Sequence, residues 1–336
     1  MSELLLTAVA ALWGATAGLF VPRPAYRFSV EPDEPWRDHC PAGHPLTGAV
    51  RGWLGLARCG ACTSGEAPGG TGGASAGGSS YDPGGTGAAS ARGPSFGLDG
   101  STGASSGGVP PHRPDSTGSA STRGQSNNPG GTGATSARVP PYGPGGTGAT
   151  PTRAPSYGPR TLLLSLTTAL ICAALALATG TRPELGVWLL LAPLGVLLAV
   201  VDFRVQRLPD VLTVSLVVAA LVLLGVVAGV PEHAGEWLGA LFGALALGGA
   251  YFVLFLINPS GMGFGDVKLA LGLGAVLGWY GWSVVFLGTF AGFLLGALYG
   301  AGLVVARRAG RKTSIPFGPF LIAGAYAGLL IGAYAA

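Results

Sequence analysis

Eight apolar runs, separated by short polar stretches, dominate the hydrophobic pattern of this chain. One lies at 4–20, and the others follow one another closely at about 161–179, 185–201, 211–230, 237–257, 267–281, 283–306 and 316–335. Apolar runs of about 17 to 25 residues are typical of helices that cross a bilayer. The pattern therefore predicts an all-α, polytopic membrane protein with about eight transmembrane helices, of which the helix at 267–281 is the shortest.

Two polar segments of different composition separate the first run from the others. Residues 22–62 are mixed in composition and hold three of the four cysteines, whereas residues 63–159 are rich in Gly, Ser, Thr and Pro and contain almost nothing apolar. A segment of the second kind cannot bury a core, so we expect a long disordered linker there. The predicted division is a first transmembrane helix (1–21), a cysteine-containing segment (22–62), the linker (63–159) and a seven-helix domain (160–336).

The composition excludes two classes of protein. Only 10% of the residues are charged, whereas soluble domains carry about 25%, and this excludes a compact soluble enzyme. The net charge is +4, but no cluster of Lys and Arg is interleaved with aromatic residues. Nucleic acid is therefore not expected as a partner, and the lipid bilayer is the expected surrounding.

The basic residues of the loops predict how the helices are oriented. If the loop after the first helix lies inside, the inner loops after residue 161 hold seven basic residues, which are Arg204, Arg207, Lys268, Arg307, Arg308, Arg311 and Lys312. The outer loops hold only Arg182. Because positive residues accumulate on the cytoplasmic side of membrane proteins, we expect both termini outside and the long linker in the cytoplasm.

Two acids, Asp202 and Asp266, adjoin apolar runs at the same predicted inner membrane face. Acids at a membrane are costly and are functional candidates by default. Two neighbouring carboxylates can share one proton and act as general base and general acid around a water molecule, which is the chemistry of aspartic proteolysis. Gly263 and Gly265 would let an extended substrate backbone approach Asp266 without a side chain in the way.

Both acids also have a purely structural interpretation. Asp202 would then be a charge at the end of a helix, paired with Arg204 or Arg207 in water. Asp266 would be the N-cap of its helix and would interact favourably with the helix dipole. Spacing alone does not decide between these interpretations and the catalytic one.

Two further charged residues lie near these acids. Asp210 precedes an apolar run and is best explained as the N-cap of the next helix. Lys268 is interpreted as an anchor at the membrane interface. The alternative for Lys268 is that it binds the substrate backbone or tunes Asp266.

Three stretches of the chain resemble motifs of the type IV prepilin peptidases, a family of intramembrane aspartyl proteases with a G-x-G-D signature. Residues 261–272 (GMGFGDVKLALG) resemble the signature itself. Asp202 with the downstream residues 207–210 (RLPD) resembles the other catalytic segment, and residues 315–320 (IPFGPF) resemble the motif of the last span. The resemblance covers about residues 185–336. A lone G-x-G-D is weak evidence, but three motifs in the same order are specific.

The resemblance implies a function and a set of site residues. Asp202 and Asp266 would be the catalytic pair, with support from Gly263, Gly265, Lys268 and Asp210. The substrate would be a pilin or pseudopilin precursor, whose short basic leader is removed at the cytoplasmic face of a bacterial plasma membrane. Components of a pilus or secretion assembly would be further partners. Proteolysis of this kind would need no cofactor.

The cysteine-containing segment matches the family less well. Family members that also methylate the new N-terminus, using S-adenosylmethionine, carry two C-x-x-C pairs that resemble a zinc site. Here Cys59 and Cys62 form one pair, but the other pair keeps only Cys40. His44, or alternatively His39, would supply the fourth ligand for zinc. An unused remnant of the site is the other interpretation.

Two more departures concern methylation. The first helix lacks the Asn that usually follows it in methylating members, and the long linker is foreign to the family pattern. We therefore expect S-adenosylmethionine as a cofactor only if that activity is retained.

Outside the protease class, the alternative function is a cation- or proton-coupled transporter that uses intramembrane carboxylates. Such a transporter predicts inverted repeats, which the sequence does not show.

Overall fold

The computed structural model describes residues 3–31, 34–64, 157, 159–259, 262–306 and 316–336. These residues belong to one compact unit and are helical, with no strand among them. Nearly all of the expected linker, 63–159, lies outside the described residues. Its exceptions are Thr63 and Ser64, which end a short helix, and Tyr157 and Pro159.

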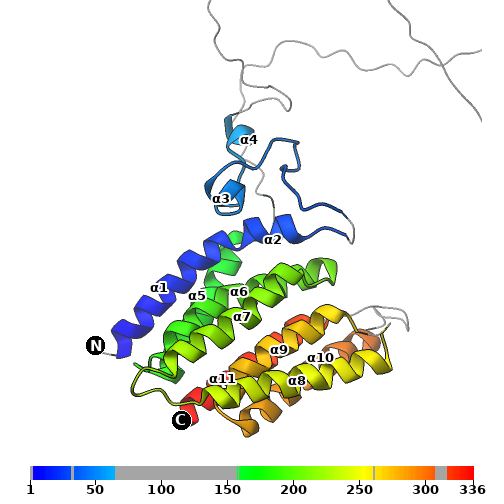
Figure 1. The fold of residues 1–336 in the computed structure, drawn as a ribbon. Helices are drawn as coiled ribbons and strands as arrows, with labels where there is room; N and C mark the ends of the chain where they lie inside the picture. The colour runs from blue at the N-terminus through cyan, green and yellow to red at the C-terminus, as the bar shows by residue number, and fades with distance from the viewer. Residues whose placement is uncertain (1–2, 32–33, 65–156, 158, 260–261, 307–315) are drawn as a thin grey trace, which may run out of the picture. The chain divides into compact units, whose positions relative to one another are not determined.

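Among the described residues, seven helical segments are long and apolar enough to cross a bilayer (Figure 1). The first combines α1 (Glu3–Phe20) with the short α2 (Pro22–Phe28), and the other six are α5 (Thr161–Thr179), α6 (Glu184–Val205), α7 (Asp210–Val227), α8 (Trp237–Ile257), α10 (Trp282–Val305) and α11 (Gly318–Ala335). The prediction of an all-α, polytopic membrane protein is thereby confirmed. Apart from α9 (Phe264–Gly278), the other helices of the described residues are α3 (Ala49–Gly52) and α4 (Gly60–Ser64), which are short and belong to the cysteine-containing segment.

The eighth predicted span forms α9 (Phe264–Gly278), which has 15 residues. At 1.5 Å per residue this helix is about 22 Å long, shorter than the roughly 30 Å of a hydrocarbon core. It begins three residues before the predicted run, because the turn that carries Asp266 is helical as well. Most of its residues are buried, and α7, α8, α10 and α11 all pack against it. A helix that is apolar all round is expected at such a central position.

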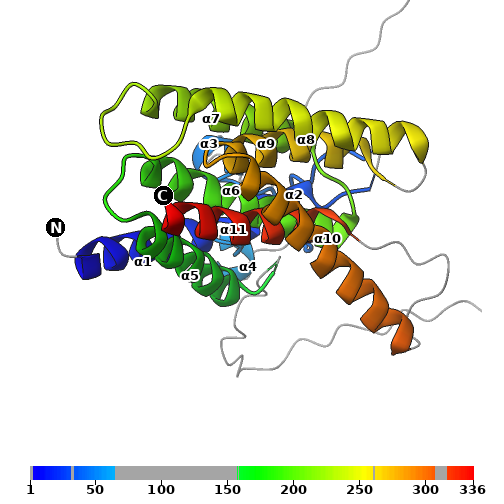
Figure 2. The same cartoon turned by 90° about the horizontal axis from the view of Figure 1, so that it is seen from below.

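Glycines bring α8 and α9 into close contact, and the two helices run side by side in both views (Figures 1 and 2). Gly239 and Gly243 of α8 face Gly274 and Gly278 of α9, so that a Cβ atom added at Gly274 would lie 2.4 Å from the carbonyl oxygen of Gly243. Small residues are the usual means by which helices approach closely in a membrane. The glycines of this pair therefore fix the position of α9 inside the bundle.

The helices that carry the two candidate acids do not pack directly on each other. α7 and α11 each contact both α6 and α9 and thereby bridge these two helices. A small apolar cavity of about 90 Å³ remains between α6 and α9, lined by residues that include Trp188, Val276 and Tyr326. The end of α6 and the starts of α7, α9 and α11 meet at one end of the bundle, which we call the aspartate end.

Replacement of Gly274 by Ala should weaken the contact between α8 and α9. The added methyl group forces the two backbones apart, and overpacking of this kind typically costs about 1–3 kcal/mol. Gly249→Ala in α8 is a matched control, because no atom lies within 4 Å of its added Cβ. We expect a lower melting temperature, followed by tryptophan fluorescence in detergent, for Gly274→Ala only. Equal melting temperatures would contradict the close packing.

Candidate functional site

Asp202 lies near the end of α6 and is almost completely buried, with 4% of its surface exposed. The helix ends at Val205, and the next residue, Gln206, adopts a left-handed conformation with a φ of 50°. The backbone N–H of Gly318, the first residue of α11, donates a hydrogen bond of 3.0 Å to Oδ2 of Asp202. A backbone donor at the N-terminus of a helix is a favourable partner for a carboxylate.

Asp266 lies in the first turn of α9 and is 8% exposed. Gly263 occupies the N-cap position, in an extended conformation. The backbone N–H of Gly263 lies close enough to the Asp266 carboxylate to stabilise its negative charge. Asp266 is therefore not the N-cap of its own helix, and the structural interpretation that made it one is wrong.

Both acids line one polar cavity of about 430 Å³ at the aspartate end of the bundle. The other residues around this cavity come from the α6–α7 connection, the residues before α9 and the start of α11, and they are Gln206, Arg207, Leu208, Asp210, Pro259, Met262, Gly263, Phe264, Gly265, Pro316 and Phe317. Two buried acids, 64 positions apart in the sequence, thus face the same space. A cavity of this size can hold water and an extended peptide.

The surroundings of Asp202 do not support its interpretation as an ordinary charge at a helix end. Among the described side chains, the ion pairs are those of Asp38 with His39 and of Asp210 with Lys268, so neither Arg204 nor Arg207 pairs with Asp202. Among the described residues, no hydrogen bond joins Asp202 to Asp266, although the two carboxylates are close enough for their charges to interact. The two carboxylates are therefore arranged around the cavity rather than against each other.

The surroundings of the two signature glycines, Gly263 and Gly265, differ in how much space they leave for a side chain. A Cβ added at Gly265 would lie 2.9 Å from the Cβ of Leu208, so this glycine lets the start of α9 approach the α6–α7 connection. A Cβ added at Gly263 would meet nothing closer than 3.8 Å. Packing does not require glycine at position 263. That this glycine leaves an open approach to Asp266 stays a prediction.

Asp210 and Lys268 form an ion pair across the edge of the cavity, with 2.7 Å between Nζ and Oδ1. The N-cap of α7 is Pro209, so the interpretation of Asp210 as an N-cap is wrong, although its charge still lies in the first turn. The ammonium group of Lys268 also lies 4.9 Å from the centre of the Phe264 ring. Since the Asp210 side chain is 70% exposed, the pair contributes at most about 1 kcal/mol to stability.

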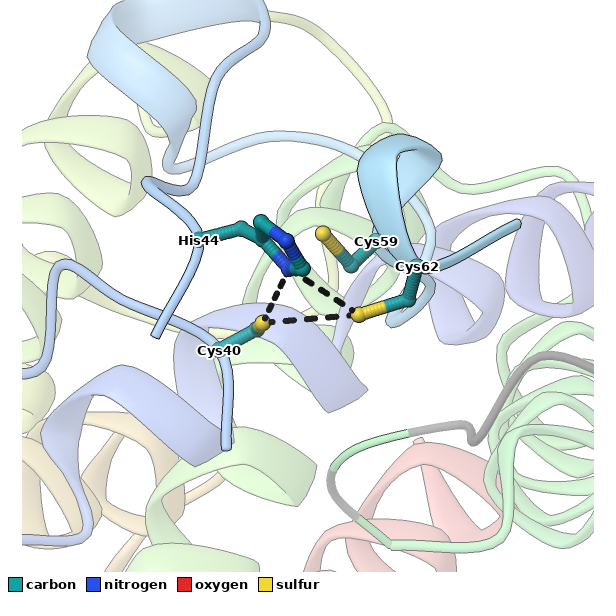
Figure 3. Close-up of side chains that lie close together, drawn as sticks. All are labelled: Cys40, His44, Cys59 and Cys62. Atoms are coloured by element: carbon teal, nitrogen blue, oxygen red, sulfur yellow. Dashed lines mark hydrogen bonds between the residues drawn. The ribbon is translucent and has the colours of Figure 1, made fainter. Parts of the chain in front are cut away.

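A second cluster of reactive side chains lies in the cysteine-containing segment (Figure 3). One ligand atom from each of Cys40, His44, Cys59 and Cys62 lies within 4.8 Å of the other three. His39 is not part of this cluster, because its side chain is 55% exposed and pairs with Asp38 at 2.6 Å. Of the two histidines that the sequence offers, the structure places His44 beside the cysteines.

The spacing of these atoms fits a tetrahedral metal ion. Zinc, with bonds of about 2.3 Å to sulfur and about 2.0–2.1 Å to nitrogen, holds two sulfurs about 3.8 Å apart and a sulfur and a nitrogen about 3.6 Å apart. Here the two Sγ atoms of Cys40 and Cys62 are 3.7 Å apart, and Nδ1 of His44 lies 3.6 Å from the first and 3.3 Å from the second. The donor set and its geometry therefore suit zinc.

The thiols of the cluster differ in acidity. Burial alone would raise the pKa of Cys40, but hydrogen bonds from the backbone N–H groups of His44 and Ala42 and from the His44 and Cys62 side chains lower that pKa to about 6. Burial and the neighbouring Cys40 and Cys59 raise the pKa of Cys62 to about 11. One thiolate thus makes the next thiol harder to ionise, and the positive charge of a bound metal ion would oppose that effect.

The cluster is attached to the rest of the segment by buried side chains. Tyr157, from the end of the expected linker, donates its backbone N–H to the carbonyl of Ala57 at 3.2 Å and packs its ring 5.0 Å from that of Tyr26. The buried Arg23 donates to the carbonyl of Thr47. Arg27 lies 4.1 Å above the ring of Trp53. These contacts hold the segment against α2.

The pattern of side chains in the sequence did not indicate a role for two residues that lie near the acids. Gly318 acts through its backbone N–H, and only its place in the IPFGPF stretch marked it. Tyr251 of α8 is buried, interacts electrostatically with Asp266 and packs its ring 6.3 Å from that of Phe317, which lines the cavity. A tyrosine within an apolar run looks like a core residue in the sequence.

Comparison with known proteins agrees with this arrangement. Residues 189–301 match the model of the type IV leader peptidase family. This region includes both candidate acids. The fold and the cavity define the chain as a polytopic membrane protein with a pair of buried carboxylates. The match places this region among the type IV leader peptidases. No solved structure was found to match the chain.

Several curated relatives carry the name prepilin leader peptidase/N-methyltransferase. The protein of Aeromonas hydrophila is 35% identical over 171 residues, which are 51% of this chain and 58% of the relative. That of Bacillus subtilis (strain 168) is 31% identical over 171 residues, 50% of this chain and 64% of the relative. That of Escherichia coli (strain K12) is 31% identical over 163 residues, 46% of this chain and 69% of the relative.

These similarities establish that the chain belongs to the type IV leader peptidase family. The chain spans less than two thirds of the length of the first of these relatives. The family match starts at residue 189, so the cysteine-containing segment lies outside it.

Proposed function

We propose that the protein is an intramembrane aspartyl endopeptidase that removes the short basic leader from type IV pilin or pseudopilin precursors. The observation that carries this proposal is the pair of buried carboxylates, Asp202 and Asp266, on one polar cavity at the end of an apolar bundle. The family to which the chain belongs and the names of its relatives support the choice of substrate.

In this proposal the two carboxylates share one proton. The ionised member takes a proton from a water molecule in the cavity while the water oxygen attacks the carbonyl carbon of the scissile peptide bond. The protonated member donates a hydrogen bond to the carbonyl oxygen, which becomes negatively charged. The C–N bond then breaks, and the leaving nitrogen takes up a proton from the pair. The step consumes one water and releases a leader carboxylate and a new amine.

The backbone donors prepare the pair for this step. The N–H group of Gly318 holds Asp202 in place through a hydrogen bond, and that of Gly263 stabilises the charge of Asp266. A mutual orientation that is fixed before the substrate arrives lowers the cost of reaching the transition state. The apolar helices around the cavity limit the access of bulk water, which strengthens these hydrogen bonds.

We further propose that the aspartate end faces the cytoplasm of a bacterial plasma membrane and that both termini lie outside. The support is the distribution of charge, since seven of the eight basic residues after residue 161 lie in the sequence at or between the ends of the helices that meet at this end, and positive charge favours the cytoplasmic side. The basic leader of a precursor would also be on that side before cleavage.

Asp202→Asn and Asp266→Asn should each lower the rate of leader removal by about 100- to 10,000-fold, the usual contribution of general acid–base catalysis. The measurement is the mass of a pilin-like precursor from the same genome, co-expressed with each variant. Glu184→Gln is a matched control, because Glu184 is also completely buried on α6 but at its other end. The amide oxygen of glutamine at position 184 can still accept the hydrogen bonds that the Ala234 N–H and the Tyr280 hydroxyl donate to Glu184.

Wild-type cleavage by either Asn variant, with the control active, would contradict the assignment of the pair. An uncut precursor with the wild-type protein, for every pilin-like precursor of that genome, would favour the transporter alternative. The same spectrum decides the methylation question, since the new N-terminus either gains the mass of one methyl group or does not.

Gly318→Ala should lower the turnover number by about 100-fold, the effect of a displacement of about 1 Å in a catalytic group. The added Cβ would lie 2.8 Å from Oδ2 of Asp202 and would push that carboxylate away. Gly195→Ala in the middle of α6 is the control, because its added Cβ has a nearest neighbour at 3.7 Å. If Gly318→Ala cleaves as fast as the control, the hydrogen bond to Asp202 has no part in positioning.

We also propose that Cys40, His44, Cys59 and Cys62 bind one zinc ion. Zinc would supply a structural cross-link within the segment 22–62. Metal analysis of the purified protein should find zinc in the wild type and in His39→Ala, and should find it lost in His44→Ala and Cys62→Ser. Zinc retained by both of the latter variants, or absent from the wild type, would contradict this site.

A further inference from the structure

A second, smaller cavity of about 200 Å³ adjoins the aspartate cavity. One wall is the end of α2 and the stretch after it, with Phe28, Val30 and Trp36, and the other is the α6–α7 connection with the start of α7, residues 207–211. Arg207, Leu208 and Asp210 line both cavities. The smaller cavity therefore begins where the aspartate cavity ends, on the other side of the same connection.

The wall contributed by the stretch after α2 is held firmly in place. The backbone N–H of Arg37 donates a hydrogen bond of 3.2 Å to the carbonyl of Arg27. The chain thus folds back on the end of α2, and Trp36 lies beside Phe28. The rings of Trp36 and Phe28 meet edge to face at 5.2 Å, and Trp36 also contacts Trp53 at 5.5 Å. Such aromatic pairs stabilise by about 0.5–1.5 kcal/mol beyond their burial.

The two walls are also joined to each other. Nη1 of Arg207 donates a hydrogen bond of 3.4 Å to the carbonyl of Glu31. Phe28, Val30 and Leu208 are buried, whereas Trp36 keeps 45% of its surface exposed. An indole that is fixed by its neighbours but leaves nearly half of its surface uncovered is suited to bind another apolar group.

We infer that this cavity is a specificity subsite for an apolar side chain of the peptide substrate, within a few residues of the scissile bond. The inference rests on the proposed function. Its support is the shared lining of the two cavities, the exposed indole of Trp36 and the mixed chemistry of the rim, where Arg207 and Asp210 can meet the polar backbone of a peptide. An extended chain advances about 3.3 Å per residue, so only residues near the cut reach this cavity.

The subsite gives the N-terminal segment a part in substrate recognition. Trp36 and Phe28 lie outside the region that matches the family model, residues 189–301, and the side chains that would select the substrate come in part from there. Recognition of the peptide thereby depends on a part of the chain distant in sequence from both acids.

The test compares the kinetics of cleavage of a precursor peptide by the purified full-length protein and two variants. Trp36→Ala removes one wall, and Val211→Trp, on the opposite wall, fills the cavity while every side chain of the aromatic cluster is kept. We expect each to raise KM by about tenfold, as for a typical anchor residue, while kcat stays within about twofold. Trp282→Ala is the control, because Trp282 is also exposed (52%) but begins α10 at the other end of the bundle.

A peptide series, in which each apolar residue near the cut is changed to Ala in turn, then identifies the occupant. One change should raise KM for the wild type and the control but cause no further increase for Trp36→Ala. Unchanged KM values for both cavity variants would overturn the subsite, and so would increases that are the same for every peptide. Failure of the wild type to cut the parent peptide would instead overturn the proposed function, and this proposal with it.

Discussion

The cost of burying two carboxylates at the end of an apolar bundle constrains the rest of this structure. Asp202 and Asp266 are both more than nine-tenths buried, and an ionised carboxylate in such a place needs polar partners. The protein supplies them through backbone N–H groups of Gly318 and Gly263 and through a cavity large enough for water. Each of these partners requires a helix to begin or end at a defined point.

The packing of the helices satisfies that requirement. α9 is short, central and held to α8 by glycines, so its first turn is fixed beneath the cavity. α7 and α11 bridge α6 and α9, which do not pack directly on each other. The distance between the two acids is therefore set by the bridging helices, and one of these, α11, also provides the donor for Asp202.

The sequence predicted the fold and the acids for identifiable reasons. Long apolar runs mark membrane helices with little ambiguity, and an acid at the end of such a run is conspicuous. α9 starts three residues before the predicted run, because hydropathy falls at Asp266 although the helix includes this residue. The pairing of Lys268 with Asp210 joins positions 58 apart, and no local pattern encodes such a contact.

Other features were beyond the reach of the sequence because they depend on the backbone or on distant neighbours. The donor role of Gly318 belongs to an N–H group that every residue except proline has. The choice of His44 over His39 depends on the fold of the segment, in which His44 lies with the cysteines and His39 pairs with Asp38. The cavity beside Trp36 exists only because the stretch after α2 folds back on the α6–α7 connection.

The central claim is that Asp202 and Asp266 work as one unit. The most direct measurement is the cleavage rate of a pilin precursor by Asp202→Asn, by Asp266→Asn and by the variant with both changes. Since residues that act as a unit are strongly non-additive, the account predicts that the double variant loses no more activity than either single one. Losses that multiply in the double variant would show that the two acids act independently and would contradict the account.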